Sequence, residues 1–204
     1  MKRIITLVVA AVMMTVATNS FAQMSVGAGF LRANDEVTLK GIDPVSVGMN
    51  GIYAGFSYNL PIAGVLGITP GLYYSMLFSN DSAFEGSLDA KLREHFVNVP
   101  VYLNVGFNLG ASSRFFIFAG PTAQIGISST AQASVEGKDF PKTDRYKDSD
   151  YSRTNLLLGG GLGLNISRFQ ITAGYDQGLF NLDTSDDGTK RQKSYAKIGV
   201  AYLF

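Results

Sequence analysis

The chain has 204 residues, a formal net charge of +1, no cysteine and 23 glycines. The small net charge gives no reason to expect a nucleic-acid partner, and the lack of cysteine excludes disulfides and a lipoprotein anchor. Most charges fall in four regions, and the stretches between them alternate apolar with small or polar residues. This pattern is typical of strands that lie in hydrocarbon and are joined by loops in water.

The first 22 residues are expected to form a secretory signal peptide. Two basic residues precede an apolar stretch, 4–16, that is too short to span a bilayer as a helix. Ser20 and Ala22 place small residues at the usual positions before a cleavage site, so that Gln23 becomes the first residue of the mature protein. An uncleaved anchor helix is the alternative.

The remaining residues, 23–204, are expected to form one domain built from strands. Apolar residues recur at every second position, which is the period of a strand, over stretches about as long as a tilted membrane strand requires. The sequence therefore predicts an all-β fold class, an eight-stranded antiparallel transmembrane up-and-down β-barrel. The expected strands are 24–31, 49–60, 65–78, 95–107, 115–128, 154–166, 169–182 and 194–204.

The connections between these strands alternate in length. The short connections are 61–64, 108–114 and 167–168, and the four long ones contain the charged regions. Outer-membrane barrels have long extracellular loops and short periplasmic turns. We therefore expect a bacterial outer-membrane location with four extracellular loops, which lie at 32–48, 79–94, 129–153 and 183–193.

The polarity of the two strand faces distinguishes a membrane barrel from a soluble one. A soluble lipocalin-like barrel also has eight alternating strands, but its polar residues face water. Here one face carries Leu, Val, Ile, Phe and Tyr without a charge in mid-strand, and the other carries Asn, Gln, Thr, Ser and Gly. A charge on a lipid-facing position is costly, so the apolar face is predicted to contact lipid.

Three prolines fall inside predicted strands. Proline cannot donate to a strand ladder, and a closed barrel has no free edge where that loss is harmless. We therefore expect bulges or strand ends at Pro70, Pro100 and Pro121.

Two charges lie on the predicted inner face of the last two strands. By parity Asp176 and Lys197 both point into the lumen, almost opposite each other, and we expect them to form an ion pair. The aromatic residues of the inner face are expected to fill the interior, which is narrow in a barrel of this size. They are Tyr53, Tyr73, Tyr102, Phe116, Phe118 and Tyr195. A filled lumen would not be an open pore.

The C-terminus carries a further pattern. Val200 and Tyr202 alternate with small or apolar residues before the terminal Phe204. This ending resembles the insertion signal of bacterial outer-membrane barrels. The resemblance implies that the barrel assembly machinery reads these three residues and that lipopolysaccharide and other outer-membrane lipids surround the protein. A last strand that ends in Phe by chance is the alternative.

The body of the chain resembles the PorT-like outer membrane protein beta-barrel domain family of Bacteroidetes-type bacteria. The resemblance is carried by His95-Phe-Val-Asn-Val-Pro-Val-Tyr-Leu-Asn-Val-Gly106 and by Gly71-Leu-Tyr-Tyr-Ser75, and it covers most of 23–204. The chain is more distantly similar to small adhesin-like barrels and to the OmpA and OmpX type of eight-stranded barrel. These likenesses imply fold and location, and they imply no catalytic residue.

Candidate chemistry is sparse. His95, the only histidine, follows Glu94, and such a pair is similar to part of the exterior site of an outer-membrane lipid A deacylase, which also needs a serine. By parity the nearby Ser75 points inward and cannot supply it. An interfacial histidine is therefore the preferred interpretation. The Asp/Lys-rich loop 136–153 could bind cations but lacks the spacing of a calcium loop, and the loop 183–188 is closer to that spacing but lacks its glutamate, so solvated loops are the preferred interpretation. We predict no catalytic, cofactor-binding or metal-binding residue and no cofactor.

The predicted function is that of a small integral outer-membrane protein with a structural or surface-interaction role, whose loops contact a surface ligand or protein. The alternatives are a narrow porin, an outer-surface lipid hydrolase and a component of a secretion apparatus.

Overall fold

The computed structural model describes residues 23–38, 44–83, 88–135, 138–148, 151–185 and 189–204. The predicted signal peptide, 1–22, lies outside these residues. The first strand begins at Gln23, directly after the predicted cleavage site. In the described part of the chain, no helix is long and apolar enough to span a membrane.

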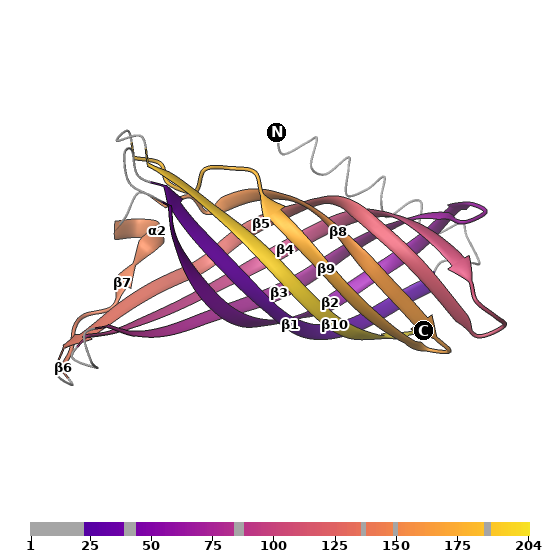
Figure 1. Cartoon of the computed structure of the whole chain (residues 1–204), viewed down its shortest axis with the longest axis horizontal. Coiled ribbons are helices and arrows are strands. Elements are labelled where there is room, and N and C mark those ends of the chain that lie inside the picture. The colour runs from indigo at the N-terminus through magenta and orange to yellow at the C-terminus, as the bar shows by residue number, and fades with distance from the viewer. Residues whose placement is uncertain (1–22, 39–43, 84–87, 136–137, 149–150, 186–188) are drawn as a thin grey trace.

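Eight long strands of the described chain form one antiparallel ring (Figure 1). Each strand pairs with its neighbours in sequence, and β5 pairs with both β4 and β8. The pairing of β1 with β10 joins the first and last strands. The prediction of an eight-stranded up-and-down barrel is therefore confirmed. The strands are β1 (Gln23–Thr38), β2 (Val45–Ala63), β3 (Leu66–Ala83), β4 (Leu88–Asn108), β5 (Ser113–Val135), β8 (Thr154–Ile166), β9 (Phe169–Gly178) and β10 (Lys190–Leu203).

The two ends of the barrel differ. At one end, here called the turn end, β8 and β9 are joined by Ser167-Arg168 alone, and Ser167 takes a left-handed backbone conformation with φ 54°. The C-terminus lies at this end (Figure 1). The opposite end, here called the loop end, carries two short strands that pair with β5 and a short helix. These elements are β6 (Lys138–Asp139), β7 (Thr143–Asp144) and α2 (Arg145–Asp148).

The strands are staggered around the ring. The stagger can be measured by following strand partners from one strand to the next, starting at Leu31 of β1. In one direction, through β2 and β3, this path reaches Glu94 in β4. In the other direction it leads through β10, β9, β8 and β5 to Asn104 in the same strand. This displacement of ten residues, from Glu94 to Asn104, requires the strands to tilt strongly against the barrel axis, as Figure 1 shows.

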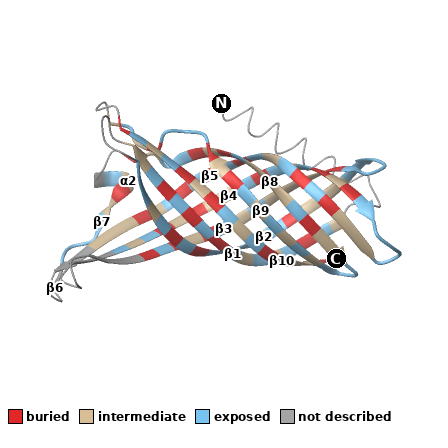
Figure 2. Cartoon of the chain, viewed as in Figure 1, coloured by how far each residue is buried: buried red, intermediate tan, exposed pale blue. Residues whose placement is uncertain are grey.

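The two faces of each strand differ as predicted. Buried and exposed residues alternate along the strands (Figure 2), and the exposed face of the barrel wall is apolar. Phe30, Ile117 and Ile198 are 45%, 47% and 55% exposed, and all three point outward. This outward apolar surface is the one that hydrocarbon covers in a membrane barrel.

Several strands continue beyond their predicted ends into the charged regions. β1 runs to Thr38 and β2 begins at Val45, so most of 32–48 is paired strand. The region 79–94 is likewise formed largely by the ends of β3 and β4. The prediction of loops over the whole of these ranges was wrong. Charged residues there continue the backbone hydrogen bonding between the strands and do not end it. β9 is shorter than predicted and ends at Gly178.

Pro70, Pro100 and Pro121 do not end or bulge their strands. Pro100 pairs with Thr122, and Leu103 pairs with Ala119 in the same register, although the residues between them are unpaired. The expectation of bulges or strand ends was therefore wrong, because the missing donors cost only local gaps in the ladder. In the described strands the register shifts between Pro61 and Ala63 and between His95 and Phe96.

Candidate functional site

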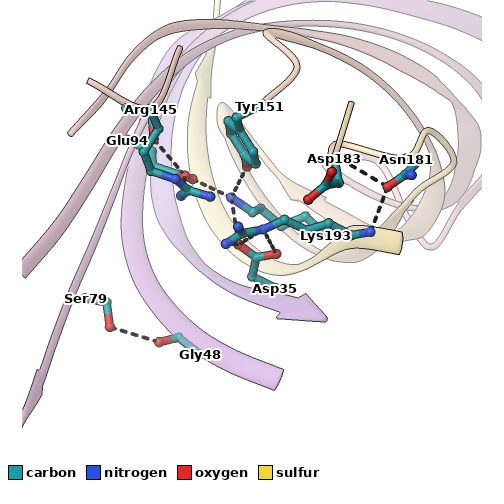
Figure 3. Close-up of polar contacts among 11 residues, drawn as sticks. Asp35, Gly48, Ser79, Glu94, Arg145, Tyr151, Asn181, Asp183 and Lys193 are labelled. Carbon is teal, nitrogen blue, oxygen red and sulfur yellow. Dashed lines mark hydrogen bonds and ion pairs between the residues drawn. The ribbon is translucent and has the colours of Figure 1, made fainter. Parts of the chain in front are cut away.

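A group of charged side chains fills the interior at the loop end, and we call it the mouth cluster. Figure 3 labels Asp35 of β1, Glu94 of β4, Lys193 of β10, and Arg145 and Tyr151 from the segment between β5 and β8. The cluster also contains Arg191 of β10, which pairs with Asp35, and Ser129 of β5, which donates a hydrogen bond to Glu94. Lys193, Glu94 and Ser129 have no exposed surface. The outward neighbours of these residues are polar, as Arg32 and Asn34 are on β1, so the cluster lies beyond the apolar band.

Lys193 stands at the centre of the mouth cluster. Its Nζ lies 2.5 Å from Glu94 Oε2 and 3.4 Å from Asp35 Oδ2. It also donates a hydrogen bond of 2.8 Å to the Tyr151 hydroxyl. Each buried acid has a second basic partner: Arg145 Nη1 lies 2.7 Å from Glu94 Oε1, and Arg191 binds Asp35 through Nε and Nη2. The buried charges are thus paired, as burial requires.

The segment between β5 and β8 closes over this cluster. Arg145 of α2 reaches Glu94, and its guanidinium lies 4.0 Å from the centre of the Tyr151 ring. The ring of Tyr146 occupies the space above Gly126, where a Cβ would overlap its hydroxyl group. The rings of Tyr146 and Tyr151 stack at 5.6 Å. These contacts hold α2 and Tyr151 over the mouth cluster.

The electrostatics of the mouth cluster favour the charged forms of Asp35 and Lys193. Burial opposes ionisation of the Asp35 carboxyl, but Lys193 and Arg191 outweigh it and lower the pKa of Asp35. Burial likewise opposes the charge on Lys193, but Glu94, Tyr151 and Asp35 raise its pKa well above the ordinary value. Burial raises the pKa of Tyr151, which therefore remains a neutral hydroxyl. Asp35 and Lys193 are therefore charged over the usual pH range.

An apolar layer and then a cavity lie below the mouth cluster. The layer consists of Leu31, Ala33, Met49, Leu77, Phe96, Leu157 and Tyr195. Beneath it the lumen encloses a cavity of about 140 Å³, and all six aromatic residues predicted to point inward line it. The prediction that they fill the lumen was wrong.

The cavity persists because the rings lie along the wall. Phe116 and Phe118 lean over Gly163 and Gly161, the residues that pair with them on β8. Tyr53 lies over Gly29 of β1 and Gly199 of β10. A ring that rests on a glycine backbone does not reach across the lumen.

The structure places Asp176 and Lys197 side by side in the lumen. Lys197 Nζ forms an ion pair with Asp176 Oδ2 and donates a hydrogen bond of 2.7 Å to the Tyr102 hydroxyl. The two residues are not directly opposite, because Asp176 pairs with Tyr195 and Lys197 pairs with Gly174. They are diagonal neighbours on the same face.

The three residues of the proposed insertion signal lie on the outer face at the turn end. Val200 and Phe204 are 61% and 70% exposed. The ring of Tyr202 contacts Phe204 and Phe169 edge to face, and Arg168 donates a hydrogen bond of 3.0 Å to its hydroxyl. The geometry gives an exposed aromatic patch, and the insertion role remains a prediction.

His95 and Glu94 point to opposite faces of β4. His95 lies outside, with Nδ1 2.6 Å from the Tyr74 hydroxyl, whereas Glu94 is buried in the mouth cluster. Ser128 pairs with His95 and shares its outward face, so a serine does lie beside the histidine. The adjacent acid faces the lumen and cannot orient the imidazole, so these three residues do not form a catalytic triad.

The mouth cluster was missed because its charges were assigned to solvated loops. The period-two pattern could have found part of it, since Asp35 continues the inward face of Leu31, and Lys193 continues that of Tyr195. Ser129 could not be found in this way. A bulge at 127–128 reverses the faces of β5, so that Ser129 faces the lumen in place of the predicted Ser128.

The described residues offer no obvious site for a metal ion. Among them no group of three His, Cys, Asp or Glu side chains is placed to hold one. The acids of the mouth cluster are each bound by two basic groups. The arrangement therefore supports closure of the barrel mouth and does not support metal chemistry there.

Comparisons with known proteins identify similar chains. Residues 14–184 match the family described as "Outer membrane protein beta-barrel domain". No curated protein matches the chain. Similar solved structures include Ail, the attachment invasion locus protein of Yersinia pestis, with 16% identity, a TM-score of 0.50, and coverage of 90% of this chain and 99% of that one. Ail in complex with the heparin analogue sucrose octasulfate is similar at 15% identity, with the same coverage and TM-score. Neisserial surface protein A has 15% identity and a TM-score of 0.44 over 89% and 97% of the two chains.

Proposed function

The chain belongs to the outer membrane protein beta-barrel domain family, and on that premise we propose that it is a small integral protein of the bacterial outer membrane with a structural or surface-binding role, neither a pore nor an enzyme. The loop end is then extracellular and the turn end periplasmic. The observation that carries this proposal is the closed mouth, where a buried ion network and an apolar layer stand between the lumen and the outside.

The closed mouth argues against the narrow porin. A solute that enters from outside would have to separate Lys193 from Glu94, both without exposed surface, and then pass the apolar layer. Breaking one buried ion pair costs about 3–5 kcal/mol. Planar-bilayer recordings of the refolded protein should show no stable conductance steps, and a steady open channel would overturn this part of the proposal.

The orientation of His95 argues against the lipid hydrolase, because its neighbouring acid faces the lumen. Only the resemblance to the PorT-like family supports a secretion component, so we do not propose that role. For the hydrolase, the test is the release of fatty acid from an acylated lipid. The wild type should release it no faster than His95→Ala.

The extracellular charge narrows the class of surface ligand. In the four loop regions, fifteen acidic residues stand against twelve basic ones, and the mouth cluster pairs three of the basic residues with two acids. The remaining charges of these four regions are therefore mostly acidic, which favours a neutral or basic partner. Although the Ail structure holds a heparin analogue, we expect this protein not to be retained on heparin at physiological salt. Strong retention would contradict the charge argument.

A further inference from the structure

The lumen cavity is open toward the turn end. Its upper limit is the apolar layer, of which Leu31, Leu77 and Phe96 line the cavity. At the lower limit Gln23, Asn59 and Arg114 line it. The same three residues also line a second hollow beside the turn 61–64. They therefore form a neck that joins the lumen to the periplasmic end of the barrel.

Arg114 gives this neck a positive charge. None of the six ion pairs among the described residues includes Arg114. In the described part of the chain its guanidinium donates hydrogen bonds to two neutral oxygens, 3.4 Å to Asn104 Oδ1 and 3.5 Å to the Val65 carbonyl. Deeper in the cavity Asp176 and Lys197 neutralise each other. A ligand that enters from the periplasm therefore meets the Arg114 cation, which attracts an anionic group.

Aromatic rings line the wall above the neck. Phe116 and Phe118 follow Arg114 along the inward face of β5, and Tyr53, Tyr73 and Tyr102 line the cavity with them. The cavity volume of about 140 Å³ is close to that of an engineered protein cavity of about 150 Å³ that binds benzene. A single aromatic ring fits this volume and finds aromatic partners there.

Several polar groups of the cavity wall are paired with one another. Gln124 donates to Asn98, which donates to Ser75, and Ser25 is hydrogen-bonded to Ser57. A ligand with many hydrogen-bonding groups would have to break these pairs. A compact apolar ring with one charged group would not.

We propose that the lumen is a binding site for a small aromatic carboxylate that enters from the periplasm, with the carboxylate held by Arg114 and the ring packed beside Phe116 and Phe118. The extracellular side takes no part, because the mouth cluster closes it. This site is independent of the proposed surface role.

The first test measures binding of 4-fluorobenzoate by fluorine NMR to the refolded full-length barrel domain in nanodiscs. Arg114→Gln should weaken binding about ten-fold, the factor of one charge-assisted hydrogen bond, while Arg114→Lys should retain most of it. The matched control is Arg168→Gln, which removes the other periplasmic arginine, on the outer face. Neutral 4-fluorobenzyl alcohol should bind more weakly than the acid. Absence of binding, or equal binding by Arg114→Gln, would overturn the proposal.

The second test measures the side of entry. The chain has no cysteine, so Thr122→Cys places a single thiol in the cavity wall. In vesicles that hold the barrel in one known orientation, a small charged methanethiosulfonate reagent that cannot cross the bilayer should label this thiol when it is added at the turn end and not when it is added at the loop end. Benzoate should slow that labelling. Labelling from the loop end would show that the mouth is open and would refute periplasmic entry.

Discussion

Glu94 and Lys193 join opposite sides of the barrel. Their strands, β4 and β10, are four places apart around the ring in either direction, and the two residues are 99 apart in sequence, yet Nζ lies 2.5 Å from Oε2. This contact spans the lumen, which ordinary strand pairing does not do. The stability of the loop end should therefore depend on it.

Removal of either partner should destabilise the barrel strongly. Glu94→Gln or Lys193→Met leaves a buried charge with fewer partners, at a cost of about 3–5 kcal/mol, whereas the double variant removes both charges and recovers part of the loss. The measurement is the urea concentration at which half of the protein is unfolded, read from the fraction that migrates as folded barrel in unheated gels. Strictly additive losses would show that the pair does not act as a unit.

The closed mouth should be insensitive to pH across the physiological range. The folded pKa of Asp35 is below its ordinary value of 3.8, so the stability it contributes is present above 3.8 and is lost as pH falls through the lower folded value. The pKa of Lys193 is raised above 10.5, so its contribution is present below 10.5 and is lost as pH rises through the folded value. Urea midpoints should be flat from about pH 5 to pH 9. A sharp change near pH 6 would contradict this electrostatic assignment.

The ion pair between Asp176 and Lys197 should also stabilise the barrel, but its loss should cost less than the loss of the pair between Glu94 and Lys193. Asp176→Asn and Lys197→Met should each lower the unfolding midpoint, and the double variant should recover part of the loss. Because Lys197 also donates to Tyr102, we expect the recovery to be incomplete. Additive losses would mean that the diagonal contact contributes nothing.

Gly126 should control docking of the segment between β5 and β8. A Cβ at this position would overlap the Tyr146 hydroxyl, so Gly126→Ala should lift the segment and speed tryptic cleavage after the exposed Lys147. About five-fold is expected for a local destabilisation of about 1 kcal/mol. Gly110→Ala is the control, because nothing lies within 4 Å of its added Cβ. Equal cleavage of both variants would contradict the docking.

Deletion of Phe204 should reduce insertion of the barrel in cells, since the proposed signal loses its last aromatic while the folded wall loses one exposed side chain. Phe169→Ala is the matched control, because Phe169 is 63% exposed and contacts the same Tyr202 ring without being terminal. The amount of heat-modifiable protein in outer-membrane fractions measures insertion. Equal yields would show that the C-terminal likeness is accidental.

Period two was sufficient to predict the fold from the sequence. The alternation around Phe30 and Ile198 identified strands and the lipid-facing side, because in a membrane barrel one face must be apolar. The strand ends were not predictable from charge. Asp35 and Glu94 are charged residues of paired strands, and their burial depends on partners far away in sequence.

The closure of the mouth could not be predicted from any one segment. Arg145 and Tyr151 lie in a stretch without strand periodicity, and only the folded ring brings them over Lys193. The cavity was also beyond prediction. Parity shows that Phe116 points inward, but it does not show whether the ring crosses the lumen or rests on Gly163.

The glycines of β8 determine how much room the barrel interior has. Gly161 and Gly163 contribute no side chain to the lumen, and the rings of Phe118 and Phe116 lie over them. A methyl group at Gly163 would meet the Phe116 ring first, so it would push that ring toward the axis and shrink the cavity without changing any chemical group that a ligand touches. The volume of the interior can therefore change in evolution independently of its chemistry, through one residue that a comparison of lining side chains would overlook.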